Sequence, residues 1–179
     1  MNVIDLPSSL DHRSMDEVLD AASRAVGGKL LLDARHVRWV DPNGMLALLS
    51  VGAVLRERRG EPVRLQMPEH PDVPGYMARM GFFRVGEGVF EPDRPPPRRV
   101  EGTSDVLLEV TPITTNSDVH DVVDRLQNRA GAILSKTLGY PPTAVVQFSV
   151  ILSEVCQNII EHAEAPGWVV AQSYNWQKR

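Results

Sequence analysis

The chain has 179 residues, of which 42% are hydrophobic and 23% charged, and its formal net charge at pH 7 is −4. These proportions are ordinary for a folded protein and exclude a wholly disordered chain. The negative net charge also disfavours nucleic acid or an anionic membrane as the main partner. Cys156 is the only cysteine in the sequence, which excludes an internal disulfide and a thiolate metal cluster.

The sequence also bears on location. No apolar run approaches the length needed to span a bilayer, and the amino terminus lacks the basic-then-apolar order of a signal peptide. We therefore expect a cytoplasmic protein that does not enter the membrane.

The chain begins with short elements of alternating type. Residues 2–6 suit an edge strand, and Ser14 and Glu17 stand at the spacing of a capping box, which predicts a helix that ends at Gly27. The apolar run at 30–32 then suits a strand in a parallel sheet that is covered on both faces.

The same alternation continues through the next fifty residues. Apolar spacing predicts a helix at 43–59, a strand at 63–67 and a short helix at 73–80. This order predicts a small α/β layer domain with right-handed crossovers over residues 1–90.

Three segments of this region resemble a STAS domain, the fold of anti-sigma-factor antagonists: 30–33 (LLLD), 39–44 (WVDPNG) and 79–83 (RMGFF). In phosphorylatable members of that family, a Ser or Thr lies between the Asp and the Gly at the helix start. Pro42 and Asn43 occupy those positions here, and neither can accept a phosphoryl group. The resemblance therefore implies a docking or scaffolding module without its switch. In the alternative interpretation, the turn is simply a loop and helix cap.

Residues 91–104 include three successive prolines, which favour an extended spacer between two domains. The second domain, at 105–179, is predicted to contain a strand at 106–110, a long helix from Asn116 or Ser117 to Gly139, and a final strand at 168–174. Asp118 suits the amino terminus of the long helix, where a carboxylate is stabilised, and needs no catalytic explanation.

A further helix is predicted between the prolines at 141–142 and the helix-stopping pair at 166–167. Its apolar residues recur at spacings of three and four, and we expect one face to pack on a core: Phe148, Ile151, Leu152, Val155 and Ile159.

Three polar residues on this helix stand four positions apart: Glu154, Asn158 and His162. They form a strip along one side of the helix. A carboxamide oxygen is a hard ligand for Mg²⁺, and a carboxylate one turn earlier can deprotonate a hydroxyl or water. The alternative is an ordinary polar strip on the surface of an amphipathic helix.

The segment EVCQNIIEHA at 154–163 resembles the first conserved box of the GHKL ATPase superfamily, in the branch of anti-sigma-factor serine kinases. The resemblance implies an α+β ATPase fold of the Bergerat type, with Asn158 holding Mg²⁺ against the ATP phosphates and Glu154 acting as the base. His162 matches the end of the pattern and is grouped with the cofactor-binding residues without a defined role. After Asn158 the chain has no Asp and only one glycine, so we expect it to lack the family's adenine pocket.

Two main functions follow from these resemblances, and a nucleotide sensor that binds ATP without transferring its phosphoryl group is a third. In the first, the polypeptide continues past Arg179, and the whole protein binds Mg-ATP and phosphorylates a Ser or Thr of a partner. In the second, the chain is a non-catalytic protein-interaction module with a truncated ATPase remnant. The expected partners are a sigma factor, a STAS antagonist or a related regulator. An incomplete ATPase sheet would expose an edge, so we also expect a homodimer or strand exchange through 168–174.

Overall fold

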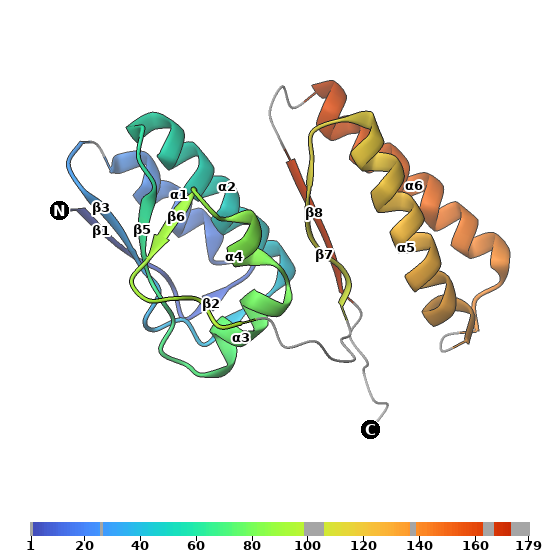
Figure 1. Cartoon of the computed structure of the whole chain (residues 1–179), viewed down its shortest axis with the longest axis horizontal. Coiled ribbons are helices and arrows are strands. Elements are labelled where there is room, and N and C mark those ends of the chain that lie inside the picture. Colours follow the sequence, from blue (N-terminus) through green and yellow to red (C-terminus); the bar gives the residue numbers. More distant parts are fainter. Residues whose placement is uncertain (1, 26, 99–105, 137–138, 163–166, 173–179) are drawn as a thin grey trace. The chain divides into compact units, whose positions relative to one another are not determined.

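The computed structural model describes residues 2–25, 27–98, 106–136, 139–162 and 167–172, and it confirms the predicted α/β class. The chain divides into two compact units, unit 1 (Met1–Gly102) and unit 2 (Thr103–Arg179) (Figure 1). Each unit has its own buried apolar residues and is described by itself.

Unit 1 is built on a parallel sheet of four strands in the order β1-β3-β5-β6. These strands are β1 (Asn2–Asp5), β3 (Leu30–Asp33), β5 (Val63–Gln66) and β6 (Phe90–Pro92). The order in the sheet follows the order in the chain, as expected when each connection crosses over to the next position. A separate pair of two-residue strands, β2 (Ser9–Leu10) and β4 (Trp39–Val40), is also parallel.

Four helices belong to unit 1: α1 (Met15–Arg24), α2 (Pro42–Arg59), α3 (Asp72–Arg79) and α4 (Phe82–Val85). α2 contributes most to the core, because it contacts α1, β2 and β5. Its buried residues lie along one broad side of the helix: Gly44, Met45, Leu48, Leu49, Val51, Gly52 and Leu55. Gly52 is required there because a Cβ at this position would overlap the Phe90 ring.

One face of the sheet differs from the prediction. Val3, Leu31, Arg64 and Glu91 lie side by side in register across the four strands. Leu31 is half-buried, and the other three side chains are exposed. The expectation that the apolar run at 30–32 is covered on both faces is therefore wrong. Leu31 points to the open face but is apolar like Leu30 and Leu32, so the sequence shows no alternation of polar and apolar residues that would have revealed this face.

The predicted capping box at Ser14 is also wrong. The hydroxyl of Ser14 donates to the carbonyl of Asp11 at 3.1 Å and accepts from the Asp11 N–H at 3.0 Å, and it does not cap α1. The reason is local: Ser14 has φ −91° and ψ −14°, in the helical region. A capping side chain needs the extended backbone that turns it toward the first free N–H groups.

Unit 1 includes the first part of the predicted spacer at 91–104. Residues 91 and 92 belong to β6, the Asp93 carboxylate accepts from the Met67 N–H at 3.0 Å, and Arg94 donates to the Pro68 carbonyl at 2.7 Å. The segment up to Arg94 is thus anchored to unit 1. Residues 99–104 of the predicted spacer lie outside the described residues.

Unit 2 consists of β7 (Val106–Ile113), α5 (Asn116–Lys136), α6 (Pro142–His162) and β8 (Gly167–Gln172). The two strands pair antiparallel, and α5 and α6 pack on each other and on β7 (Figure 1). A small core holds them together: Leu108, Ile113, Val119, Val122, Leu126 and Cys156. All four predicted elements are present, although residues 173 and 174 of the last strand lie outside the described residues.

The Asp118 carboxylate, in the first turn of α5, stabilises the start of the helix. The Asp118 carboxylate accepts from the Thr114 hydroxyl, the Thr114 N–H and the Thr115 N–H, each at 2.8 Å. These bonds, led by that of the Thr114 side chain, lower the pKa of Asp118 to about 2. The prediction that Asp118 serves the helix terminus is confirmed.

Candidate functional site

α6 carries two apolar seams that run side by side along the helix and are offset by one residue. We call the first the core seam: Val145, Ser149, Leu152, Cys156 and Ile159. We call the second the outer seam: Ala144, Phe148, Ile151 and Val155, continued by Asn158 and His162. Both follow alternating steps of four and three residues, which keep side chains on one side of a helix.

The core seam packs inside unit 2. Cys156 is fully buried in the small core, and Leu152 and Ile159 pack against that core. Ser149 is buried too, and its hydroxyl donates to the Val145 carbonyl one turn earlier at 3.0 Å. Burial raises the pKa of the Cys156 thiol. A thiol held neutral in a core is a packing group and has little nucleophilic character.

The outer seam is mostly exposed, although three of its residues were predicted to pack on a core. Phe148, Ile151 and Val155 are 39%, 63% and 56% exposed, whereas Leu152 and Ile159 pack on the core as predicted. The predicted apolar face combined residues from two seams about 100° apart. Periodicity alone could not separate them, because both seams are apolar over the first three turns.

The predicted strip lies on the side of α6 that faces away from the core. Glu154, Asn158 and His162 are all exposed. Among the described residues, none provides a hydrogen-bond or ion-pair partner for these three side chains. The neighbouring Gln157 differs, since its amide donates to Asn116 at 3.3 Å and to Glu161 at 3.2 Å. The structure thus keeps the strip on one side of the helix, with its polar groups uncommitted.

The donor chemistry of this strip fits one wall of an Mg-ATP site. Asn158 offers a carboxamide oxygen, and Glu154 offers a carboxylate one turn earlier, both of which are hard oxygen donors. No group of three His, Cys, Asp or Glu that could hold a metal ion occurs within the described ranges. Nucleotide sites normally enclose most of their ligand. The residues present could therefore contact Mg-ATP from one side, without enclosing it.

The Asp41–Gly44 turn of unit 1 is an ordinary helix cap. The Asp41 carboxylate accepts from the Gly44 N–H at 2.7 Å, with extended backbone at Asp41 (φ −103°, ψ 172°). Pro42 occupies the first helical position, where its missing N–H costs nothing. Gly44 is needed because a Cβ there would overlap the Leu10 carbonyl. The loop-and-cap interpretation therefore accounts for Asp41, Pro42 and Gly44. Asn43 is exposed and takes no part in the cap.

An ion pair between the buried Asp33, at the end of β3, and the exposed Arg35 was not anticipated. Asp33 is 4% exposed, and its carboxylate accepts from the Arg35 N–H at 3.0 Å, from Arg35 Nε at 3.1 Å and from Arg35 Nη2 at 2.6 Å. The hydrogen bonds from Arg35 lower the pKa of Asp33, and those same contacts raise the pKa of Arg35. The signal in the sequence was an Asp that ends an apolar strand, with an Arg two residues later. The pair closes the turn after β3.

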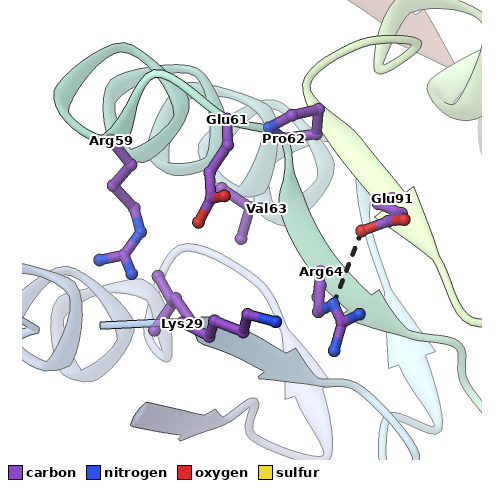
Figure 2. Close-up of a pocket in the computed structure, with 8 residues that line it drawn as sticks. Lys29, Arg59, Glu61, Pro62, Val63, Arg64 and Glu91 are labelled. Carbon is purple, nitrogen blue, oxygen red and sulfur yellow. Dashed lines mark ion pairs between the residues drawn. The ribbon is translucent and has the colours of Figure 1, made fainter. Parts of the chain in front are cut away.

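A cavity of about 120 Å³ lies beside the amino ends of β3 and β5, where Lys29, Arg59 and Glu61 surround one opening (Figure 2). Arg64 also lines it and pairs with Glu91 at 3.6 Å. Three cations and two carboxylates nearly cancel, and the carboxyl end of α2 directs carbonyl oxygens toward this region. Ligands of open α/β sheets bind at the carboxyl ends of strands. These observations give the cavity no anion-binding character.

α6 is long and apolar enough to cross a membrane, with a mean hydropathy of 1.4 over its most apolar window. The prediction that no apolar run approaches this length is therefore wrong for α6, whose polar residues are too few and too scattered to interrupt it. Core helices of soluble proteins that are mostly buried pass the same test, and α6 packs on α5, β7 and β8 along one side only. The described part of the chain has the character of a soluble protein, although only 11% of that window is buried.

Comparison with known proteins gives no family for this chain. No family model matches the sequence, and neither a curated protein nor a solved structure is significantly similar to it. The fold class therefore rests on the structure itself, and the STAS and GHKL resemblances rest on the quoted motifs.

Proposed function

We propose that the chain belongs to a cytoplasmic regulator of the partner-switching type. In it, unit 1 is a STAS-like module that docks a protein partner, and the outward side of α6 provides the Glu154 and Asn158 part of an anti-sigma-kinase-like ATPase site. The observation that carries the proposal is the placement of these two side chains. They stand one turn apart on an exposed side of the helix, without partners among the described residues, while the opposite side packs on the core.

Each residue has a distinct role in this proposal. The Asn158 carboxamide oxygen would bind Mg²⁺, and the Glu154 carboxylate would accept the proton of the attacking Ser or Thr hydroxyl of a partner. When bound, ATP would supply the phosphoryl group, and Mg²⁺ would neutralise charge that develops during transfer. His162 would border the same side of the helix, two turns after Glu154. The partner would be a sigma factor, a STAS antagonist or a related regulator.

A second function is a binding module without turnover. Two observations favour it: Pro42 and Asn43 occupy the positions of the phosphoacceptor, and the oxygen donors of α6 lie on an open surface beside exposed apolar side chains. In this case unit 1 still docks a partner, and Glu154 and Asn158 form polar contacts with a protein.

Calorimetric titration of the 179-residue chain with ATP and MgCl₂ separates the two functions. The informative variants are Asn158→Ala and Glu154→Gln, and Gln147→Ala is the matched control because Gln147 is an exposed polar residue two turns before Glu154. The ATPase proposal predicts binding that Asn158→Ala weakens at least about tenfold, an effect of roughly 1.4 kcal/mol, and that the control leaves unchanged. Glu154→Gln should retain binding and block phosphoryl transfer. An absence of binding at millimolar ATP would contradict the proposal for this chain and leave the binding module.

A further inference from the structure

The outer seam of α6 leaves three large apolar side chains in solvent within two turns of helix. Phe148, Ile151 and Val155 are 39%, 63% and 56% exposed, and Ala144 continues the row one turn earlier. A row of apolar residues at alternating four- and three-residue steps is the pattern that packs against a second helix. We infer that a second copy of this chain docks on the outer seam, with α6 antiparallel to α6 about a two-fold axis near Ile151.

The charge distribution of α6 indicates the kind of surface that fits the seam. No Asp, Glu, Lys or Arg occurs from residue 137 to residue 153, so the first charged residue on the helix is Glu154. A charged partner would find no counter-charge along this stretch, and its own charges would lose water without compensation. An uncharged, apolar helix face meets the requirement, and α6 presents that face itself. A two-fold interface sets the same patch against itself.

Glu154 determines the orientation of the pair. In a parallel arrangement, the two copies of Glu154 would lie at the same level beside the seam, and like charges that face each other are destabilising. In an antiparallel arrangement about Ile151, Glu154 instead lies near Phe148 and Gln147 of the partner copy, where an amide can donate to the carboxylate. The helix dipoles also oppose each other in this arrangement.

A membrane surface fits the seam less well. Helices that lie in a membrane interface carry Lys or Arg on their polar side, where these side chains meet anionic lipid. α6 carries neither residue type, and Glu154 borders the seam. The contact involves about four turns on each copy, so we expect a dimer at the small end of specific interfaces, with a micromolar dissociation constant.

Sedimentation velocity of the full chain, from low micromolar to several hundred micromolar, tests the inference. Ile151→Glu and Val150→Glu form a matched pair, because both side chains are 63% exposed and adjacent in sequence, yet only Ile151 belongs to the seam. We expect Ile151→Glu to raise the dimer dissociation constant at least about tenfold, and Val150→Glu to change it less than about threefold. Circular dichroism checks that each variant keeps its helix content.

Cysteine cross-linking tests the orientation. Under mild oxidation, Ile151→Cys should form a covalent dimer, and Val150→Cys should not. Mixing Phe148→Cys with Val155→Cys should give the mixed dimer in excess over either homodimer, whereas a parallel pair gives the reverse. The wild-type chain is the control, since its one cysteine, Cys156, is buried.

Three results would overturn the inference: a monomer over the whole concentration range, equal weakening by both glutamate variants, or a dimer that Ile151→Glu does not affect. Co-sedimentation with lipid vesicles that Ile151→Glu abolishes would also contradict it, because the occupant would then be lipid. All the variants retain Glu154 and Asn158. Because Asn158 continues the seam and Glu154 meets the partner copy, the dimer and Mg-ATP would compete for these two side chains, so the ATP titration is run at concentrations where the chain is monomeric, and failure of either proposal can then be told from failure of the other.

Discussion

α2 and α6 are both long, apolar helices, and they differ in how much of their surface is buried. α2 has 18 residues and buries seven of them, whereas α6 has 21 residues and buries only Ser149 and Cys156. The difference follows from their neighbours. α2 contacts α1, β2 and β5 and buries a broad arc of one side, whereas α6 contacts α5, β7 and β8 and buries only a narrow stripe. Hydrophobic composition therefore indicates that a helix can be buried, and the packed layers decide how much of it is.

The largest expected effect uses this contrast directly. Leu48, in α2, is 1% exposed, and Leu48→Ala should lower the free energy of unfolding by about 2–5 kcal/mol, because it leaves a cavity. Ile151→Ala on the outer seam should change it by less than about 0.5 kcal/mol, as for other surface positions. Urea unfolding at concentrations where the chain is monomeric measures both values. Similar losses for the two variants would show that α6 is covered within the monomer.

The next largest effect concerns the ion pair after β3. Asp33→Asn should cost about 1–3 kcal/mol at neutral pH, since it weakens the hydrogen bonds that three Arg35 nitrogens donate to a buried carboxylate. Asp5→Asn is the control, because Asp5 is the exposed neighbour of Asp33 in register on β1.

The pH dependence of the same pair has a definite sign. The pKa of Asp33 is lower in the folded chain than its ordinary 3.8, so its stabilisation is complete above that ordinary value. It is lost as the pH falls through the lowered pKa. Unfolding measured across this acid range should show a stability difference between wild type and Asp33→Asn that shrinks with decreasing pH. A constant difference would show that the carboxylate charge is not what stabilises the turn.

A smaller effect is expected at the cap of α2. Asp41→Ala removes the bond to the Gly44 N–H and should cost about 0.5–2 kcal/mol. Asn43→Ala, two residues later on an exposed side chain, is the control and should be nearly neutral. Thermal unfolding of both variants compares them. If Asp41 served only a partner, its replacement would leave the stability of unit 1 unchanged.

The smallest effect is a shift in a titration at the cap of α5. The Asp118 carboxyl should titrate near pH 2 by NMR, and Thr114→Val should move this midpoint back toward 3.8, because the Thr114 hydroxyl is the largest cause of the lowered pKa. Asp118 thus supports α5 above the ordinary pKa, and this support is lost as the pH falls toward 2. A midpoint unchanged in Thr114→Val would show that the backbone N–H groups suffice.

Much of the fold could be predicted from local pattern. The strand at 30–32, the helix up to Arg59 and the helix after Pro142 are each marked by apolar spacing and by residues that stop or start elements. The short strands β2, β4 and β6 were missed, because two or three residues carry no periodicity. Ser14 shows the same limit for caps, since spacing does not report the backbone angles on which a capping bond depends.

The candidate site could be predicted in composition and only partly in placement. Four-residue spacing correctly put Glu154, Asn158 and His162 on one side of a helix. It could not show whether other elements enclose them, because that depends on residues distant in sequence. The Asp33–Arg35 pair was missed for the same reason: an Asp at a strand end is buried only if the following turn folds back over it.

The sequence by itself determined the α/β class, the positions of the long helices, and the order of polar and apolar residues along α6. These are local properties, set by the 3.6-residue period and by where proline and glycine interrupt it. Only the tertiary structure decided which of two equivalent seams faces the core. Ser149 and Cys156 are buried, and Ile151 is exposed, because β7 and α5 meet α6 on that side, and one residue of offset turns a side chain by about 100°.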